Sequence, residues 1–213
     1  MFLDKLCKTN PNLIQIAVHM HQQKQILPDT YIVDVDRFLE NAKAILQKAN
    51  EQNIELYYML KQIGRNPYLA KELEKIGYKG AVVVDFKEAE VMMKNHLHIA
   101  HAGHLVQIPS MMINQLVAYG CDYITVYSYE KLVEVNEAAK KIGLVQKVCV
   151  RVIGENDRIY SGQTAGFYLN QLEELVQKSK DLKYIEIAGV DNFPCFLYDE
   201  VTKEIQAQEN LHT

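Results

Sequence analysis

Every second residue of 54–61 is apolar, so one face of this segment is continuously apolar, which predicts a β-strand. The even positions, from Ile54 to Leu60, are all apolar, whereas the other face ends on Lys61. Parallel α/β folds place their chemistry at the carboxyl ends of strands, so this lysine is a candidate functional residue. The alternative is a strand-terminal lysine that simply reaches solvent.

Downstream of Lys61, short β-rich runs alternate with amphipathic helical patterns. Helix starts are marked by Asn66 before Pro67 and by Ser128, and helix ends by Gly77 and Gly143. Regular alternation of this kind predicts an α/β fold with a parallel sheet, either open or closed into a barrel. The expected strands cover residues 54–61, 80–85, 98–108, 123–127, 148–153 and 184–190. These six strands are two fewer than a (β/α)8 TIM-type barrel needs.

The first part of the chain reads differently. Leu13, Ile14, Ala17 and Val18 recur at helical spacing, so residues 1–29 are expected to form an N-terminal helical extension. Residues 30–36 alternate as a strand would, and a helical pattern follows them. We therefore expect two parts: the extension, residues 1–29, and an α/β barrel domain, residues 30–213.

Composition narrows the choice of partners. The 213 residues are 48% hydrophobic, and 23 basic residues stand against 27 acidic ones without a long run of either sign. This balance argues against nucleic acid or an anionic membrane as the main partner. The N-terminus lacks the layout of a secretory signal, and no apolar stretch reaches the length of a bilayer span, so a cytoplasmic location is expected.

Several motifs resemble, in combination, those of one protein family. They lie at residues 57–67, 101–109, 150–155, 162–163 and 192–198. Together they resemble the N-terminal barrel of alanine-racemase-like, fold-type-III pyridoxal 5'-phosphate (PLP) proteins, in particular the uncharacterised YhfX-type branch of amino-acid racemases. The resemblance implies a PLP-binding (β/α)8 TIM-type barrel, here incomplete. It also implies PLP as cofactor and a small amino acid as substrate.

The resemblance assigns a role to Lys61 first. In that family the lysine at the end of the first barrel strand forms a Schiff base with PLP, and Lys61 occupies the matching position. A lysine amine released by the substrate can then move the α-proton of that substrate. Arg65 stands where alanine racemases usually have a tyrosine that contacts the cofactor phosphate, and an arginine is chemically suited to phosphate.

Three further residues are expected in the cofactor pocket: His104, Arg151 and Asn192. His104 lies near the carboxyl end of its strand. Arg151 needs an anionic partner, either a substrate carboxylate or a strand carboxylate such as Glu186. Asn192 sits near where related enzymes place a ring-stacking histidine. The neighbouring histidines have no carboxylate at ligand spacing, so we expect no metal site.

The polar loop of residues 154–166 is too long for a simple connector. Its residues Arg158, Tyr160 and Gln163 are expected to contact the substrate. The alternative is a solvated surface loop.

Three functions remain open at this stage. The first is a PLP-dependent amino-acid racemase or a close relative. The second is an aldolase-type enzyme that uses a lysine Schiff base without a cofactor, and the third is a non-catalytic PLP-binding protein or truncated remnant. The family's remaining barrel strands and its C-terminal β domain have no counterpart before Thr213. The isolated chain is therefore expected to racemise poorly, and to form a homodimer or associate with a missing C-terminal portion.

Overall fold

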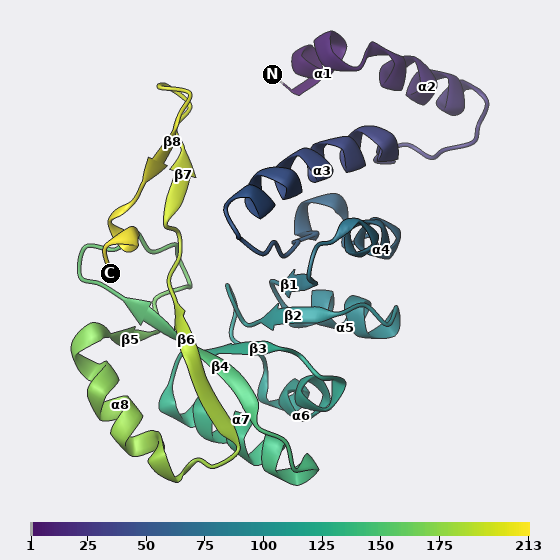
Figure 1. Ribbon diagram of the computed structural model, residues 1–213. Coiled ribbons are helices and arrows are strands. Elements are labelled where there is room, and N and C mark those ends of the chain that lie inside the picture. Colours follow the sequence, from purple (N-terminus) through teal and green to yellow (C-terminus); the bar gives the residue numbers. More distant parts are fainter. Residues whose placement is uncertain (1) are drawn as a thin grey trace. The chain divides into compact units, whose positions relative to one another are not determined.

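The computed structural model describes residues 2–213 and divides into two compact units, Met1–Asn53 and Ile54–Thr213 (Figure 1). The first unit consists of helices α1 (Phe2–Thr9), α2 (Pro11–Gln22) and α3 (Val35–Glu51), as the helical prediction for this region indicated. Asn10 caps α2, and its side-chain amide donates a hydrogen bond to Asp34 at 2.6 Å. The expected division at residues 29 and 30 stays a prediction.

The strand predicted for residues 30–36 is wrong. No strand forms within residues 2–53, and Tyr31 is 94% exposed. Asp34 instead accepts a hydrogen bond from the backbone amide of Arg37 at 3.0 Å and caps α3, which begins at Val35. The cap gives a hydrogen-bond partner to a backbone amide at the start of the helix. A strand at residues 30–36 would have no neighbouring strand to pair with, so its alternating pattern would not stabilise it.

A parallel sheet forms the centre of the second unit. Its strands are β1 (Ala81–Val83), β2 (Ile99–Ala102), β3 (Tyr123–Val126), β4 (Gln146–Ile153), β5 (Phe167–Tyr168) and β6 (Ile185–Asp191). They pair in the order β1-β2-β3-β4, after which both β6 and the short β5 pair with β4. The sheet confirms the predicted α/β class, and β5 is a short strand that the sequence pattern did not reveal.

The segment before Lys61 lies beside β1 without forming a full strand. Tyr58 and Ala81 make an isolated parallel bridge. The amide of Tyr58 donates to the carbonyl of Gly80 at 3.0 Å, and the carbonyl of Tyr58 accepts from Val82 at 2.8 Å. Lys61 itself begins a single 3-10 turn, η1 (Lys61–Ile63). The strand predicted for residues 54–61 is thus reduced to this bridge, while the other five predicted strands correspond to β1, β2, β3, β4 and β6.

Five helices flank the sheet, and their caps match the sequence signals. They are α4 (Pro67–Ile76), α5 (Phe86–Lys94), α6 (Ser110–Tyr119), α7 (Tyr129–Ile142) and α8 (Leu172–Lys178). Asn66 caps α4 and Ser128 caps α7, while Gly77 and Gly143 end these helices in the left-handed conformation. Fully buried residues of the helices, such as Leu116 and Leu132, form the core together with strand residues.

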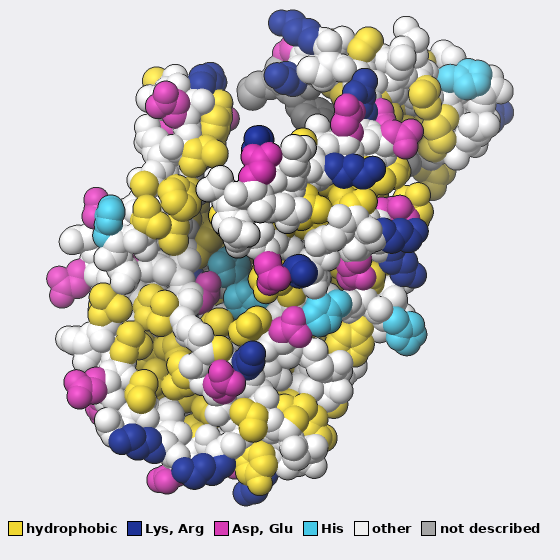
Figure 2. All heavy atoms as spheres, viewed as in Figure 1, with side chains coloured by type: hydrophobic (Ala, Val, Ile, Leu, Met, Phe, Trp, Pro, Cys, Tyr) yellow, Lys and Arg dark blue, Asp and Glu magenta, His cyan; other side chains and the backbone are white. Residues whose placement is uncertain are grey.

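A hairpin follows the sheet, in a stretch beyond the last strand that the sequence predicted. Strands β7 (Phe196–Tyr198) and β8 (Ile205–Ala207) pair antiparallel. Figure 2 shows apolar side chains gathered over this hairpin, where Phe196, Tyr198 and Ile205 are each more than half exposed. Within residues 2–213 no helix is both long and apolar enough to cross a bilayer.

Candidate active site

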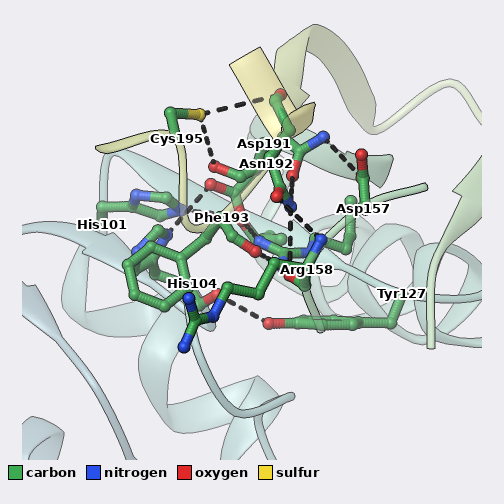
Figure 3. A network of polar contacts seen from close by, with 12 residues as sticks. His101, His104, Tyr127, Asp157, Arg158, Asp191, Asn192, Phe193 and Cys195 are labelled. Carbon is green, nitrogen blue, oxygen red and sulfur yellow. Dashed lines mark hydrogen bonds and ion pairs between the residues drawn. The ribbon is translucent and has the colours of Figure 1, made fainter. Parts of the chain in front are cut away.

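Polar side chains gather where β2, β4 and β6 end. The carboxyl ends of parallel strands meet at one edge of a sheet, so residues far apart in sequence come together there. His104 follows β2, Arg151 lies near the end of β4 and Asp191 ends β6. Figure 3 shows His104, Asp191 and Phe193 close together in this network.

Asp191 links the histidine to the arginine. Its Oδ1 lies 3.0 Å from His104 Nδ1, and its Oδ2 lies 3.4 Å from Arg151 Nη1. Arg151 Nη2 also donates to the backbone carbonyl of Phe193 at 2.8 Å. Burial alone would raise the pKa of Asp191, but the hydrogen bond to His104 and the nearby positive charges hold it below its usual range. The carboxylate therefore stays ionised inside the site.

The partner of Arg151 differs from the example that the sequence suggested. Glu186 pairs in register with Lys147, whereas Arg151 pairs in register with Asp191. An irregularity between Val148 and Cys149 shifts the pairing of β4 with β6, and strand parity read from sequence cannot reveal such a shift. A strand carboxylate is thus the partner of Arg151, but it comes from the end of β6. Its contact with cofactor stays a prediction.

His101 is a half-buried, neutral neighbour of this network. Its Nε2 lies 2.5 Å from the hydroxyl of Thr125, and its ring centroid lies 5.7 Å from that of His104. Burial lowers the pKa of His101 from 6.5 to about 4. The imidazole is therefore uncharged at neutral pH, so it adds no positive charge to the site.

Asn192 belongs to a second network that fastens the 154–166 loop. Its Nδ2 donates to Asp157 at 3.1 Å, and its Oδ1 accepts from the side chain of Asn210 at 3.1 Å. Asn210 is buried, and it also bonds the backbone amide and carbonyl of Arg158. Asp157 accepts a further hydrogen bond from Thr213 at 2.6 Å. The structure thus gives Asn192 structural partners, and its expected cofactor contact is still a prediction.

The three predicted substrate residues of the loop lie in different surroundings. Tyr160 lies beside Phe193, with ring centroids 6.0 Å apart, and Arg158 lies 5.8 Å from the Tyr160 ring. Gln163 lines a cavity of about 260 Å³ together with Leu105, Val106, Gln107, Tyr127, Gly162 and Ala165. The loop therefore approaches the segment after His104, as a substrate-covering loop would.

Lys61 is exposed, and its ammonium has no hydrogen-bond or ion-pair partner within residues 2–213. The preceding residue, Leu60, is 2% exposed, and its amide donates to Glu88 at 3.3 Å. Glu88 is 1% exposed and also accepts from the amide of Val84 at 2.7 Å. The backbone that leads into Lys61 is therefore fixed, while its ammonium group is exposed, and its attachment to a cofactor stays a prediction.

Arg65 pairs with a carboxylate. Its Nη2 lies 2.9 Å from Asp85 Oδ2, and its backbone has a positive φ of 54°. Its Nε is buried without a partner within the described part of the chain. Arg65 thus lies near the end of β1 and has one N–H donor without a partner within residues 2–213. Its contact with the cofactor phosphate stays a prediction.

Sequence reasoning missed several residues that organise this site, namely Glu88, Asp157, Asp191 and Asn210. One signal was present: Asp85 followed three positions later by Glu88 is the spacing of an N-terminal capping box. The others act through contacts between distant segments. No group of three or more metal-ligating side chains occurs among residues 2–213.

Comparisons with known proteins place the chain in context. A family model described as "Alanine racemase, N-terminal domain" matches residues 33–212. The chain is 45% identical over 213 residues to the uncharacterized protein YhfX of Escherichia coli (strain K12). This match covers 100% of the chain and 55% of YhfX, so the chain spans about half the length of that relative.

Solved structures share the fold at low sequence identity. Diaminopimelate decarboxylase from Helicobacter pylori, complexed with L-lysine, superposes with a TM-score of 0.65 and 17% identity, over 81% of this chain and 45% of the enzyme. D-threonine aldolase from Filomicrobium marinum gives 0.61 and 18%, over 75% and 42%. Alanine racemase from Clostridium difficile 630 gives 0.55 and 24%, over 74% and 42%. These three enzymes have a similar barrel-type fold.

Proposed function

The chain belongs to the family of alanine racemase N-terminal domains, and on that premise we propose that it is the Lys61-bearing half of a PLP-dependent amino-acid racemase. Lys61 would hold the cofactor covalently, and the substrate would be a small amino acid whose α-proton is moved. The similar solved structures include a decarboxylase, an aldolase and a racemase, so their fold alone favours no single reaction. The family match is what favours racemisation.

The observation that carries this proposal is the position of Lys61. Its free amine follows directly on a segment that pairs with β1, at the sheet edge where His104, Arg151 and Asp191 also lie. A lysine amine at such an edge can attack an aldehyde carbon, and loss of water then leaves the nitrogen bonded to that carbon.

The side chains present fit an anionic aldehyde cofactor. Arg151 is 2% exposed and keeps its Nε without a partner among residues 2–213, and Arg65 has an orphaned Nε as well. Unused guanidinium donors near a reactive lysine suit phosphate or carboxylate oxygens. When bound, PLP would supply an electron sink for the substrate α-carbon.

Each remaining side chain has a proposed part in binding or orientation. Arg65 would contact an anionic group of the cofactor, Arg151 and His104 would line its pocket, and Asn192 would hold the pocket edge through Asp157. On the loop, Tyr160 and Gln163 would contact the substrate beside Arg158. Closure of this loop over the substrate would exclude water from the site.

The isolated chain is proposed to racemise poorly. It spans 55% of YhfX, and the edge of β6 opposite β4 carries no partner strand within residues 2–213. An open parallel edge favours pairing with further polypeptide. A second copy of the chain, or a polypeptide corresponding to the rest of the relative, would serve as that partner.

Absorbance tests the proposed cofactor. The purified chain, incubated with PLP and then desalted, should keep a visible absorption band and a yellow colour. Lys61→Ala should lose the band under the same treatment, because the covalent attachment is gone. Lys71→Ala, which removes another exposed lysine on α4, is the matched control and should stay yellow. A wild-type chain that stays colourless contradicts the proposal.

A further inference from the structure

We propose that His104 is a proton-transfer residue that acts on the α-carbon of the substrate, with Asp191 as the residue that positions it. The inference rests on the proposed function, because a PLP-bound amino acid supplies the acidic α-proton. It adds a second group able to move that proton, in addition to Lys61.

The hydrogen bond with Asp191 fixes which nitrogen of His104 can accept a proton. Nδ1 lies 3.0 Å from Asp191 Oδ1, and a carboxylate can only accept in this pair, so Nδ1 carries the hydrogen. In the neutral ring, Nε2 then keeps its lone pair. It has no hydrogen-bond partner within residues 2–213, and 18% of the side chain is exposed. A substrate can therefore reach the basic nitrogen.

Arg151 favours the ionised form of Asp191, which His104 needs as its partner. The Arg151 side chain is 3% exposed, and its guanidinium lies against the second oxygen of Asp191. The positive charge favours an ionised carboxylate, and an ionised carboxylate stabilises the imidazolium that forms when Nε2 takes a proton. Arg151 thus keeps Asp191 ionised, and the ionised Asp191 supports His104 as a general base.

The His104 ring is also held in place. Phe193 packs against it edge to face (Figure 3), and the ring centroids lie 5.2 Å apart. The hydroxyl of Tyr127 donates to the backbone carbonyl of His104 at 2.7 Å. An orientation fixed by both backbone and ring lowers the cost of reaching the reactive geometry.

The strand order places His104 and Lys61 within reach of one small substrate. The segment before Lys61 pairs with β1, and β1 pairs with β2, which leads to His104. Neighbouring strands lie about 4.8 Å apart, so the two strand ends are separated by roughly 10 Å. Both side chains start from the same sheet edge, so an α-carbon can lie between them.

The proposed step transfers one proton from the substrate to His104. The bond between the α-carbon and its hydrogen breaks, and the proton forms a new bond to Nε2 of His104. The electron pair of the broken bond stays on the α-carbon, where PLP, when bound, would supply the electron sink that stabilises it. The reverse transfer returns a proton to the same carbon, so in heavy water the step exchanges hydrogen for deuterium.

The first test measures the tautomer of His104 in the cofactor-free chain by nitrogen-15 NMR of the imidazoles at pH 8. Wild type should show hydrogen on Nδ1 alone, and Asp191→Asn should shift the population toward hydrogen on Nε2. His98 offers a matched control, because it pairs with Asp122 at 2.7 Å beside the other end of β2. Its signals should not change in Asp191→Asn. Hydrogen on Nε2 of His104 in wild type would overturn the inference.

The second test follows deuterium uptake at the α-carbon of L-alanine and of D-alanine, separately, with the PLP-loaded chain in heavy water. Uptake is measured because exchange of the α-proton of one enantiomer needs only one proton-transfer residue, so it proceeds even in a chain that racemises poorly. His104→Gln should slow uptake by 10²-fold or more for one enantiomer, the lower range for loss of a general base. The other enantiomer should keep its rate, and cofactor absorbance should stay unchanged. His98→Gln should exchange like wild type.

The outcomes separate the two claims. Unchanged uptake in His104→Gln, an equal loss for both enantiomers, or no uptake by a yellow wild type would each overturn the role of His104 and leave the cofactor proposal standing. A wild type that retains no PLP would overturn the proposed function, and the proton-transfer role of His104 with it.

Discussion

Glu88 accepts a hydrogen bond from the backbone amide of Leu60, 28 positions earlier in the chain, at 3.3 Å. The second carboxylate oxygen accepts from the amide of Val84 at 2.7 Å. One buried side chain thus joins the segment that leads into Lys61 to the strand that leads into Asp85, the partner of Arg65. The backbone positions of Lys61 and Arg65, both proposed to bind the cofactor, therefore depend on the two hydrogen bonds of Glu88.

Replacement of Glu88 should therefore destabilise the domain. In Glu88→Gln the side-chain amide has one accepting oxygen, and its NH2 group faces a second backbone donor, so one buried amide loses its partner. We expect a loss of about 1–3 kcal/mol in the free energy of unfolding, measured by urea denaturation. Glu90→Gln, on the same helix but 45% exposed, should cost less than about 0.5 kcal/mol. Equal stabilities of the two variants would contradict the claim that Glu88 joins the two segments through its hydrogen bonds.

The sequence predicts the elements of the second unit well where local signals are strong. Asn66, Ser128, Gly77 and Gly143 mark helix ends by capping and by the left-handed conformation, and the structure confirms them. The same local logic explains the failure at residues 30–36, because the cap formed by Asp34 outweighs a short alternating pattern. Strands of two or three residues, such as β5, have too few positions to show a period.

The candidate site was harder to predict, because it depends on register. Arg151 needed a carboxylate, and the irregular pairing of β4 with β6 brings Asp191 opposite it, whereas Glu186 lies opposite Lys147. Asn210 bonds Arg158 from 52 positions away, and no short-range pattern indicates such a contact. The sequence pointed to Lys61 because both the alternating pattern that ends on it and the motif around it are local features. The network beside His104 joins distant segments, so no local pattern reveals it.

Gly103 should tolerate no side chain. Its φ is +87°, and an added Cβ would lie 2.7 Å from the backbone carbonyl oxygen of Thr125, which is part of β3. Gly120 has a similar φ of +93° but open space around it. Gly120→Ala should thus cost about 1 kcal/mol for its backbone alone. Gly103→Ala should cost at least about 2 kcal/mol more, because the strand must move.

Thermal unfolding of the two glycine variants measures this difference. A melting temperature for Gly103→Ala at or above that of Gly120→Ala would show that the chain passes β3 less closely than described. The result bears on the site, because Gly103 directly precedes His104.

Burial of His101 should make stability depend on pH. Its pKa is lowered from 6.5 to about 4 in the folded chain, so the unfolded chain binds the proton more readily. The resulting stability is fully present above about pH 6.5 and is lost as the pH falls toward 4. Between pH 7.5 and pH 5 the loss from this residue is about 2 kcal/mol.

Urea denaturation of wild type and His101→Asn at both pH values isolates this effect. The variant should lose about 2 kcal/mol less than wild type on going to pH 5, and any constant cost of the replacement cancels in the comparison. His98→Asn, which replaces an exposed histidine, should behave as wild type. An identical pH dependence of wild type and His101→Asn would mean that His101 is not buried in its neutral form.

The central claim is that Lys61 is the residue to which PLP attaches, and borohydride trapping followed by peptide mass spectrometry tests it most directly. The wild-type chain, treated with PLP and then reduced, should carry one pyridoxyl group on the peptide that contains Lys61, while Lys71 and Lys79 stay unmodified. Trapping of a substrate fragment on Lys61 without the cofactor would instead indicate an aldolase-type enzyme. A pyridoxyl group spread over several surface lysines, or absent from Lys61, would contradict the account.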